Sequence, residues 1–181
     1  SMNMLHAKRG VGKTHFGLSI AYAVATGGNF LKWHAPKARK VCYLDGEMSA
    51  YGLQERLRAI REANPDSDLA LSNLKIYTPD QQIGPILDIS DISWHSALEE
   101  FIGDAELVIV DNLSCLARST GNENEADSWS VLGDWGLGLR RQGKAVIFLH
   151  HDGKNGQQRG TSKKEDILNN VIGLRHPPEY T

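Results

Sequence analysis

The sequence predicts an α/β fold, a three-layer sandwich in which helices cover both faces of a mainly parallel sheet. Short apolar runs alternate along the chain with segments of helical periodicity, and a glycine-rich stretch directly follows the first run. Continuous β-branched runs are typical of strands buried on both faces, and strands that alternate with helices favour parallel pairing through right-handed crossovers. Ligands bind such sheets at the carboxyl ends of the strands. The residues after each run are therefore the candidates for function.

Six apolar runs are expected to form the strands, because each is short, continuous and bounded by polar or turn-forming residues. They occupy residues 3–6, 41–44, 74–77, 107–110, 145–149 and 171–174.

The first two helices are expected on either side of the second strand. One runs from Lys13 to about Thr26, is composed of small and apolar residues, and stops at two glycines. Ser49 is predicted to cap the other, which carries Leu53, Leu57 and Ile60 on one face. It ends before the Asn-Pro pair at 64–65.

Two further helices are marked by aromatic residues at helical spacing. Trp94, Leu98 and Phe101 define a short helix closed by a glycine, and Trp129 and Leu139 belong to a longer one. Tryptophans in such a pattern are expected to pack in the core rather than to stack on nucleic-acid bases.

Composition is typical of one soluble globular domain spanning residues 1–181. The chain is 40% hydrophobic and 23% charged, and no apolar run approaches the roughly 20 residues of a membrane span. We therefore expect no membrane association and a cytoplasmic location. Cys42 and Cys115 lack metal-ligand spacing, and we expect them to be buried, reduced thiols.

Charge is distributed unevenly. Residues 66–140 carry 14 acidic side chains and 3 basic ones, whereas residues 150–164 carry four basic side chains and one acidic one. A polyanion would be repelled by the first stretch and attracted to the second. The candidate nucleic-acid contacts are Lys154, Arg159, Lys163 and Lys164. The alternative is an ordinary solvated loop, which charge counting leaves open.

Residues 6–16, HAKRGVGKTHF, predict a nucleotide-binding loop after the first strand. The pattern G-x-x-x-x-G-K-[ST] ends here in Gly12, Lys13 and Thr14, although Ala7 stands in place of its first glycine. Such a loop and the following helix N-terminus bind phosphate, Lys13 reaches the β- and γ-phosphates, and Thr14 binds Mg²⁺. An alanine is tolerable if its φ is negative. The candidate ATP-binding residues are Arg9, Gly10, Val11, Gly12, Lys13, Thr14 and His15.

Carboxylates follow the next strands. Asp45 and Glu47 come after the second, where a carboxylate would face the γ-phosphate, and Glu47 is the better candidate for the base that activates water. Both could instead be surface acids at a helix start. Asp111 ends an apolar strand in the Walker B manner and, with Thr14, is the candidate Mg²⁺ ligand.

Two histidines follow the fifth run. Consecutive strand residues point to opposite faces, so His150 and His151 are not expected to bind one metal ion. We expect His150 to be a polar sensor near the γ-phosphate and His151 to be a supporting residue.

Taken in order, RGVGKTHF (9–16), LDGEMS (44–49), LVIVDNLSCL (107–116) and LHHDGKNGQQRGTS (149–162) resemble the RecA-like P-loop ATPases. The resemblance covers about Leu5 to Leu174. It is strongest to the hexameric replicative helicases and to the RepA-like ATPase domains of plasmid and phage primase–helicase proteins.

The resemblance implies a RecA-like core that hydrolyses Mg-ATP, with Lys13, Glu47 and His150 as catalytic residues. It implies a DNA-contacting loop at 152–162, single-stranded DNA as partner, and a homo-oligomer, such as a hexamer, in the parent protein. Arg175 is the candidate finger for a neighbouring subunit. The chain is expected to be an excised or minimal core without flanking primase or DNA-binding segments.

Two other functions are open. One is a nucleotide-controlled switch or loader in replication or recombination, with little turnover of its own. The other is a small-molecule phosphotransferase, which is disfavoured because it needs a lid of arginines, whereas residues 118–127 are acidic apart from Arg118.

Overall fold

The protein, as a computed structural model, is described over residues 1–67, 71–118, 125–152, 167–177 and 179. A six-stranded sheet forms its middle layer, in the order β5-β4-β6-β7-β1-β8, and every pairing in it is parallel. These strands are β1 (Met2–Ala7), β4 (Val41–Asp45), β5 (Leu74–Tyr77), β6 (Leu107–Asp111), β7 (Ala145–His151) and β8 (Asn170–Leu174). All six predicted strands are confirmed.

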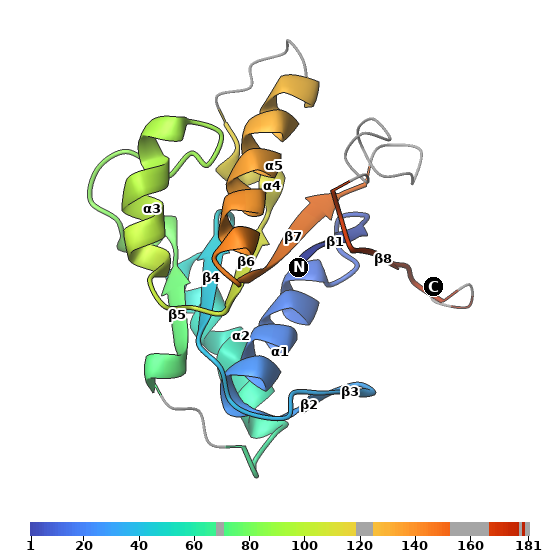
Figure 1. Ribbon diagram of the computed structural model, residues 1–181. Helices are drawn as coiled ribbons and strands as arrows, with labels where there is room; N and C mark the ends of the chain where they lie inside the picture. Colours follow the sequence, from blue (N-terminus) through green and yellow to red (C-terminus); the bar gives the residue numbers. More distant parts are fainter. Residues whose placement is uncertain (68–70, 119–124, 153–166, 178, 180–181) are drawn as a thin grey trace.

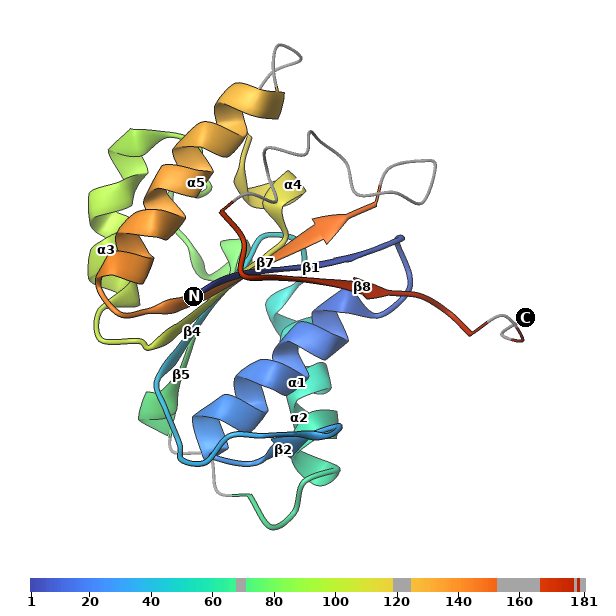
Figure 2. The same cartoon turned by 45° about the vertical axis from the view of Figure 1, so that its right-hand side comes forward.

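Helices cover both faces of this sheet, which confirms the three-layer α/β sandwich (Figures 1 and 2). One face carries α1 (Lys13–Thr26) and α2 (Ala50–Glu62). The other carries α3 (His95–Ile102), the single turn α4 (Leu113–Leu116) and α5 (Glu125–Arg141). Ser49 caps α2 as predicted, because its hydroxyl accepts a hydrogen bond from Gly52 N at 3.1 Å.

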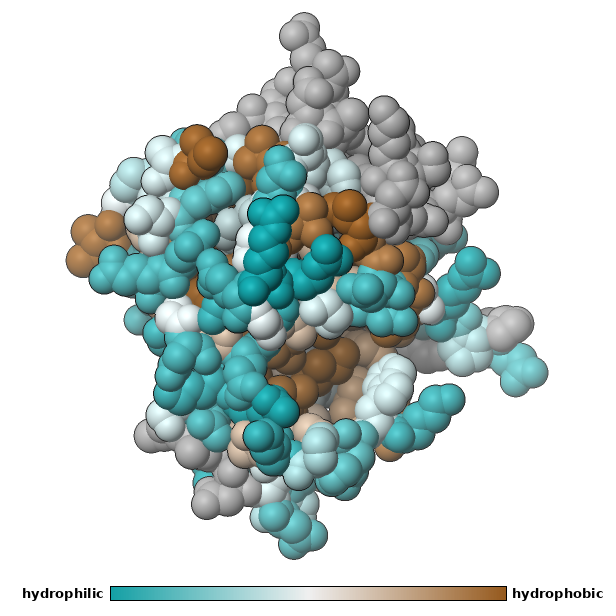
Figure 3. Space-filling model, in the orientation of Figure 1, coloured by the Kyte–Doolittle hydropathy of each residue, from teal (hydrophilic) through white to brown (hydrophobic). Residues whose placement is uncertain are grey.

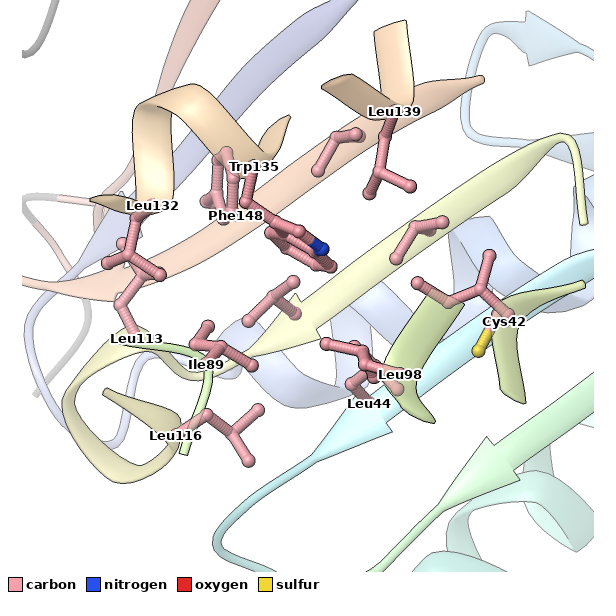
Figure 4. Packing of buried hydrophobic residues seen from close by; sticks show 14 of the residues in the cluster. Cys42, Leu44, Ile89, Leu98, Leu113, Leu116, Leu132, Trp135, Leu139 and Phe148 are labelled. Atoms are coloured by element: carbon pink, nitrogen blue, oxygen red, sulfur yellow. The ribbon is translucent and has the colours of Figure 1, made fainter. Parts of the chain in front are cut away.

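Each face of the sheet has its own hydrophobic core, and side chains alternate between the two along every strand. Phe148 of β7 belongs to the core beneath α3, α4 and α5, whereas its neighbour Leu149 belongs to the core beneath α1 and α2. Figure 4 shows the first core, in which Trp135 of α5 packs against Phe148 of β7 with ring centroids 6.4 Å apart. Trp129 is buried there, as the helical spacing predicts, whereas Trp94 is only half-buried against the same core.

Several short elements were not predicted. Between α1 and β4 lies a hairpin of β2 (Asn29–Phe30) and β3 (Trp33–His34), and three 3₁₀ turns occupy Leu71–Asn73, Pro79–Gln81 and Ile92–Trp94. Phe30 packs edge-on against Phe16 of α1, with ring centroids 4.8 Å apart. The hairpin was missed because its two-residue strands are too short to show alternation.

The strand β8 is the outermost strand on the β1 side of the sheet. Beside it lies an open groove of about 410 Å³, lined mainly by hydrophobic side chains of α1, the hairpin and the sheet. Figure 3 shows hydrophobic residues gathered in a hollow on this face of the molecule. Cys42 is buried, Cys115 is half-buried, and both are free thiols.

Candidate functional site

The glycine-rich loop joins β1 to α1 at the carboxyl edge of the sheet. Gly10 and Gly12 have φ of 83° and 96°, a conformation that side-chain-bearing residues rarely adopt. A Cβ atom at either position would meet nothing within 4 Å, so their backbone conformation, and not crowding, requires glycine. Among the described non-glycine residues only Leu31 has a positive φ. Ala7 is therefore compatible with the loop, as the sequence predicted.

The loop leaves polar groups available at the start of α1. The side chain of Arg9 and that of His15 are exposed, and Val11 is half-buried. The first N–H groups of a helix have no acceptor within it, and they carry the positive end of the helix dipole. A glycine loop followed by such a helix start is suited to binding phosphate.

The Lys13 side chain is buried and folds back beneath the loop. Its Nζ lies 2.8 Å from His151 Nδ1 and 3.4 Å from the carbonyl oxygen of Ala7. Burial lowers the pKa of the Lys13 ammonium, and the carboxylates of Asp111 and Glu47 oppose this shift. The group is therefore held among acceptors where a phosphate could replace them.

The tautomer of His151 follows from its contact with Lys13. An ammonium group only donates hydrogen bonds, so His151 Nδ1 accepts and the ring proton lies on Nε2. Burial and the neighbouring Lys13 both lower the pKa of His151, which favours this neutral form. Its Nε2 lies 3.7 Å from Glu47 Oε2. The ring thus lies between the phosphate-loop lysine and the exposed glutamate.

The position of His150 corrects a prediction. Residues 146 and 148 of β7 face the core beneath α5, and strand alternation places His150 with them, on the face away from Lys13. Its neighbour His151 follows Leu149 on the α1 face and contacts Lys13. The sequence indicated that only one of the pair could face the site, but it gave no means of choosing the strand phase.

Asp111 is buried at the end of β6, next to the first turn of α1. Its Oδ2 accepts a hydrogen bond from the Tyr43 hydroxyl at 2.7 Å. Burial raises its pKa, and the hydrogen bonds from Tyr43 and Thr14 oppose that rise. Thr14 and Asp111 thus present a hydroxyl and a carboxylate to each other, and hard oxygen ligands of this kind suit Mg²⁺.

Asp45 lies beside Asp111, because the two are register partners on β4 and β6. Its Oδ2 accepts from Met48 N at 3.0 Å, whereas Oδ1 is buried and has no hydrogen-bond partner among the described residues. Burial raises the pKa of Asp45 to about 7, and the charge of Asp111 contributes to the rise. The sequence ranked Asp45 below Glu47 as a candidate base.

Glu47 follows β4 and projects from the site with 53% of its side chain exposed. Its Oε2 accepts a hydrogen bond from Asn112 Nδ2 at 2.6 Å. The sequence analysis gave Asn112 no role. The available signal was its position directly after Asp111, where a strand ends and an asparagine can cap a following helical turn.

A second groove, of about 360 Å³, opens beside the loop. Its lining comes from Val11, Gly12, His15, Phe16, Phe30 and residues 174–177. Arg175, the candidate finger for a neighbouring subunit, is exposed and lines this groove beside the chain's own loop.

The candidate nucleic-acid contacts Lys154, Arg159, Lys163 and Lys164 lie outside the described residues. Asp152, which precedes them, is described. Its backbone N–H donates to the Ala7 carbonyl at 3.0 Å, and its carboxylate lies 2.6 Å from His6 Nδ1. In the part of the chain that the structure describes, no helix is long and apolar enough to cross a membrane.

Comparisons with known proteins agree with this architecture. A family model described as an AAA domain matches residues 1–157. The KaiC-like protein from the hyperthermophilic archaeon Pyrococcus horikoshii OT3 has a TM-score of 0.64 at 15% identity, with 99% of this chain and 74% of that chain covered. The RadB recombinase has a TM-score of 0.63 at 18% identity, with 98% and 76% covered. No curated protein matches the sequence.

Proposed function

The chain belongs to the AAA domain family, and from that premise we propose that it is an ATP-binding and ATP-hydrolysing motor core acting in DNA replication or unwinding. Its family and fold are those of a RecA-like P-loop ATPase. The narrower placement in the RepA-like helicase branch belongs to the proposal. The observation that carries it is the meeting of Lys13, Asp111 and Glu47 at one edge of the sheet.

ATP binding would use the loop for phosphate and the adjacent groove for the nucleoside. Lys13 exchanges His151 for the β- and γ-phosphate oxygens, while the first N–H groups of α1 bind phosphate. Gly12 of the phosphate loop lines this groove, so a nucleoside attached to the bound phosphates could reach it. Phe16, Phe30 and Leu174 give the groove an apolar wall suited to a nucleobase.

Hydrolysis would depend on Glu47 and His151. The Glu47 carboxylate lies beside His151 and Asn112, is open to solvent, and would take the proton from the water that attacks the γ-phosphate. Thr14 and Asp111 would hold Mg²⁺, and the bound ion would supply positive charge beside the phosphates. We assign the sensor role to His151 in place of His150, because His151 Nδ1 lies 2.8 Å from Lys13 Nζ and its Nε2 lies 3.7 Å from Glu47 Oε2.

Coupling to single-stranded DNA is supported by the contacts of Asp152, the residue directly before the basic segment 153–166. The Ala7 carbonyl accepts hydrogen bonds from Lys13 Nζ and from Asp152 N, so the phosphate-loop lysine and Asp152 share one acceptor. That segment carries all four candidate DNA contacts. The RadB recombinase is among the proteins with a similar fold.

We also propose that the active form is a homo-oligomer such as a hexamer, in which this domain of residues 1–181 is the ATPase core. A finger supplied by a neighbouring subunit is worth about 10³- to 10⁵-fold in rate. Arg175 lies beside its own chain's loop, so a finger for the neighbour must come from elsewhere or from a rearranged Arg175. This position favours the second candidate function, a nucleotide-controlled switch with little intrinsic turnover.

The test is ATP hydrolysis at rising protein concentration, with and without single-stranded DNA, for the unmodified chain, Lys13→Ala and Glu47→Gln. A motor predicts a rate that rises faster than concentration, responds to DNA and is lost in both variants, while Glu47→Gln still binds ATP. Slow turnover that is linear in protein and indifferent to DNA indicates the switch. If ATP does not bind, both candidates are wrong.

A further inference from the structure

We propose that Asn112 is the positioning residue for Glu47, and that it sets the direction in which the Glu47 carboxylate faces the attacking water. The inference rests on the proposed role of Glu47 as the base. It begins from the 2.6 Å hydrogen bond between Asn112 Nδ2 and Glu47 Oε2.

The orientation of the Asn112 amide is determined at both ends. Its Oδ1 accepts a hydrogen bond from Cys115 N at 3.2 Å, which caps the turn α4. A backbone N–H requires an acceptor and a carboxylate requires a donor, so the oxygen must face Cys115 and the nitrogen must face Glu47. The amide cannot rotate by 180° without losing both bonds.

Asn112 itself is held firmly, whereas Glu47 is not. Asn112 is 1% exposed, and its backbone carbonyl oxygen accepts hydrogen bonds from the N–H groups of Cys115 and Leu116, each at 3.1 Å. More than half of the Glu47 side chain is exposed. A flexible glutamate gains a fixed direction from a buried partner, and hydrogen bonds to charged acceptors are among the stronger ones in proteins.

The backbone around Glu47 is tied to the same turn. Gly46 N donates to the Asp111 carbonyl at 2.8 Å. A Cβ atom at Gly46 would lie 2.7 Å from Leu116 Cγ and 3.1 Å from Cys115 Cβ, so α4 packs directly on this glycine. That close approach keeps the Asn112 amide within reach of Glu47.

The arrangement links the base to the metal side of the site. Asn112 directly follows Asp111, so one chain segment carries both the proposed Mg²⁺ ligand and the group that holds the base. A water between them would thus meet a carboxylate of fixed direction. Displacing catalytic groups by about 1 Å can cost on the order of 100-fold in rate.

Two substitutions separate this role from a structural one. Asn112→Ser keeps an oxygen that can cap α4 but is too short to reach Glu47, and Asn112→Asp keeps the cap and the length but replaces the donor with a carboxylate. Both should lower kcat about 10- to 100-fold, with KM for ATP changed by less than about threefold.

The matched control is Ser114→Ala, which removes the hydroxyl group of an exposed residue in the same turn and should leave kcat unchanged. Thermal unfolding of every variant checks that it is folded. If kcat of folded Asn112→Ser stays within about twofold of the unmodified chain, the inference is wrong. It is also wrong if kcat and ATP affinity fall together with the melting temperature.

Failure of the proposed function gives a different pattern. If Glu47→Gln hydrolyses ATP as fast as the unmodified chain, Glu47 is not the base, and the role of Asn112 is lost with it. If Glu47→Gln is inactive and the Asn112 variants are not, the proposed function stands and only the positioning role is refuted.

Discussion

The Lys13 ammonium and the His151 imidazole lie 2.8 Å apart beneath the phosphate loop, so the loop lysine is paired with a residue of β7. Because the lysine donates, His151 is neutral, and its remaining N–H points to the side of the site that holds Glu47. A phosphate that takes Lys13 would free His151 Nδ1. The histidine is therefore placed to register whether the loop is filled.

The adjacent histidines provide a matched test of this relationship. His151→Gln should lower ATP turnover by about tenfold or more, because it alters the contact to Lys13 and the side of the site near Glu47. His150→Gln should change turnover by less than about twofold, since that side chain lies on the opposite face of β7. Steady-state kinetics of both variants at saturating ATP provide the measurement. The reverse pattern would restore His150 as the sensor.

Asp45 predicts a pH dependence of stability in the absence of nucleotide and Mg²⁺. Its pKa is raised from 3.8 to about 7 by burial, so between these pH values the folded state binds a proton that the unfolded state has lost. Stability should therefore fall as pH rises from about 4 to about 7, with a slope of at most about 1.4 kcal/mol per pH unit. Asp45→Asn should remove this contribution.

Denaturant unfolding of the unmodified chain and Asp45→Asn between pH 4 and pH 8 measures the effect. The variant should gain stability relative to the unmodified chain as pH rises, since an amide does not ionise. A difference that is constant with pH would mean that Asp45 does not carry the raised pKa.

Sequence patterns predicted most of the fold because the residues that become buried are the apolar ones, and their spacing differs between strands and helices. The run at 145–149 and the face carrying Leu53 and Ile60 have no other reason to be apolar, and both are buried in the structure. The hairpin at 29–34 escaped prediction because it is held by aromatic contacts between Phe16 and Phe30, which join segments separated along the chain.

The site was predictable in its residue types but not in its side-chain geometry. Asp111 and Lys13 follow from their places at a strand end and in the loop. The choice between His150 and His151 depends on the phase of β7, and two consecutive polar residues at a strand end do not reveal it. Asn112 could not be assigned because its role depends on Glu47, 65 residues earlier in the chain.

Leu174 tests whether the second groove holds the nucleoside. Leu174→Trp should fill part of the groove and weaken ATP binding by about tenfold, or roughly 1.4 kcal/mol. Binding of inorganic triphosphate should change by less than about twofold, because the phosphate loop is untouched. Calorimetric titration with both ligands measures the two affinities. Val171→Trp, on the same strand but outside this groove, is the control and should leave both unchanged.

Equal losses of ATP and triphosphate affinity in Leu174→Trp would mean that the substitution disturbs the loop itself. Unchanged ATP affinity would mean that the nucleoside lies elsewhere. Only a loss confined to ATP supports the proposed position of the base.

Gly46 gives a prediction for stability that also bears on the site. A methyl group at this position would lie 2.7 Å from Leu116 Cγ and 2.9 Å from its Cδ2, and both residues belong to packed segments. Relieving that overlap requires α4 to move, and overpacking of this kind costs about 1–3 kcal/mol. Because α4 is capped by Asn112, the movement should also lengthen the bond to Glu47 and reduce turnover.

The control for Gly46→Ala is Gly138→Ala, in the last turn of α5. A Cβ atom there would meet nothing within 4 Å, and alanine favours helix over glycine, so this variant should gain about 0.5–1 kcal/mol. Urea denaturation of both variants gives the free energies of unfolding, and ATP turnover is measured alongside. If Gly46→Ala is as stable and as active as the unmodified chain, α4 can retreat without cost, and the close contact at Gly46 does not hold Asn112 against the base.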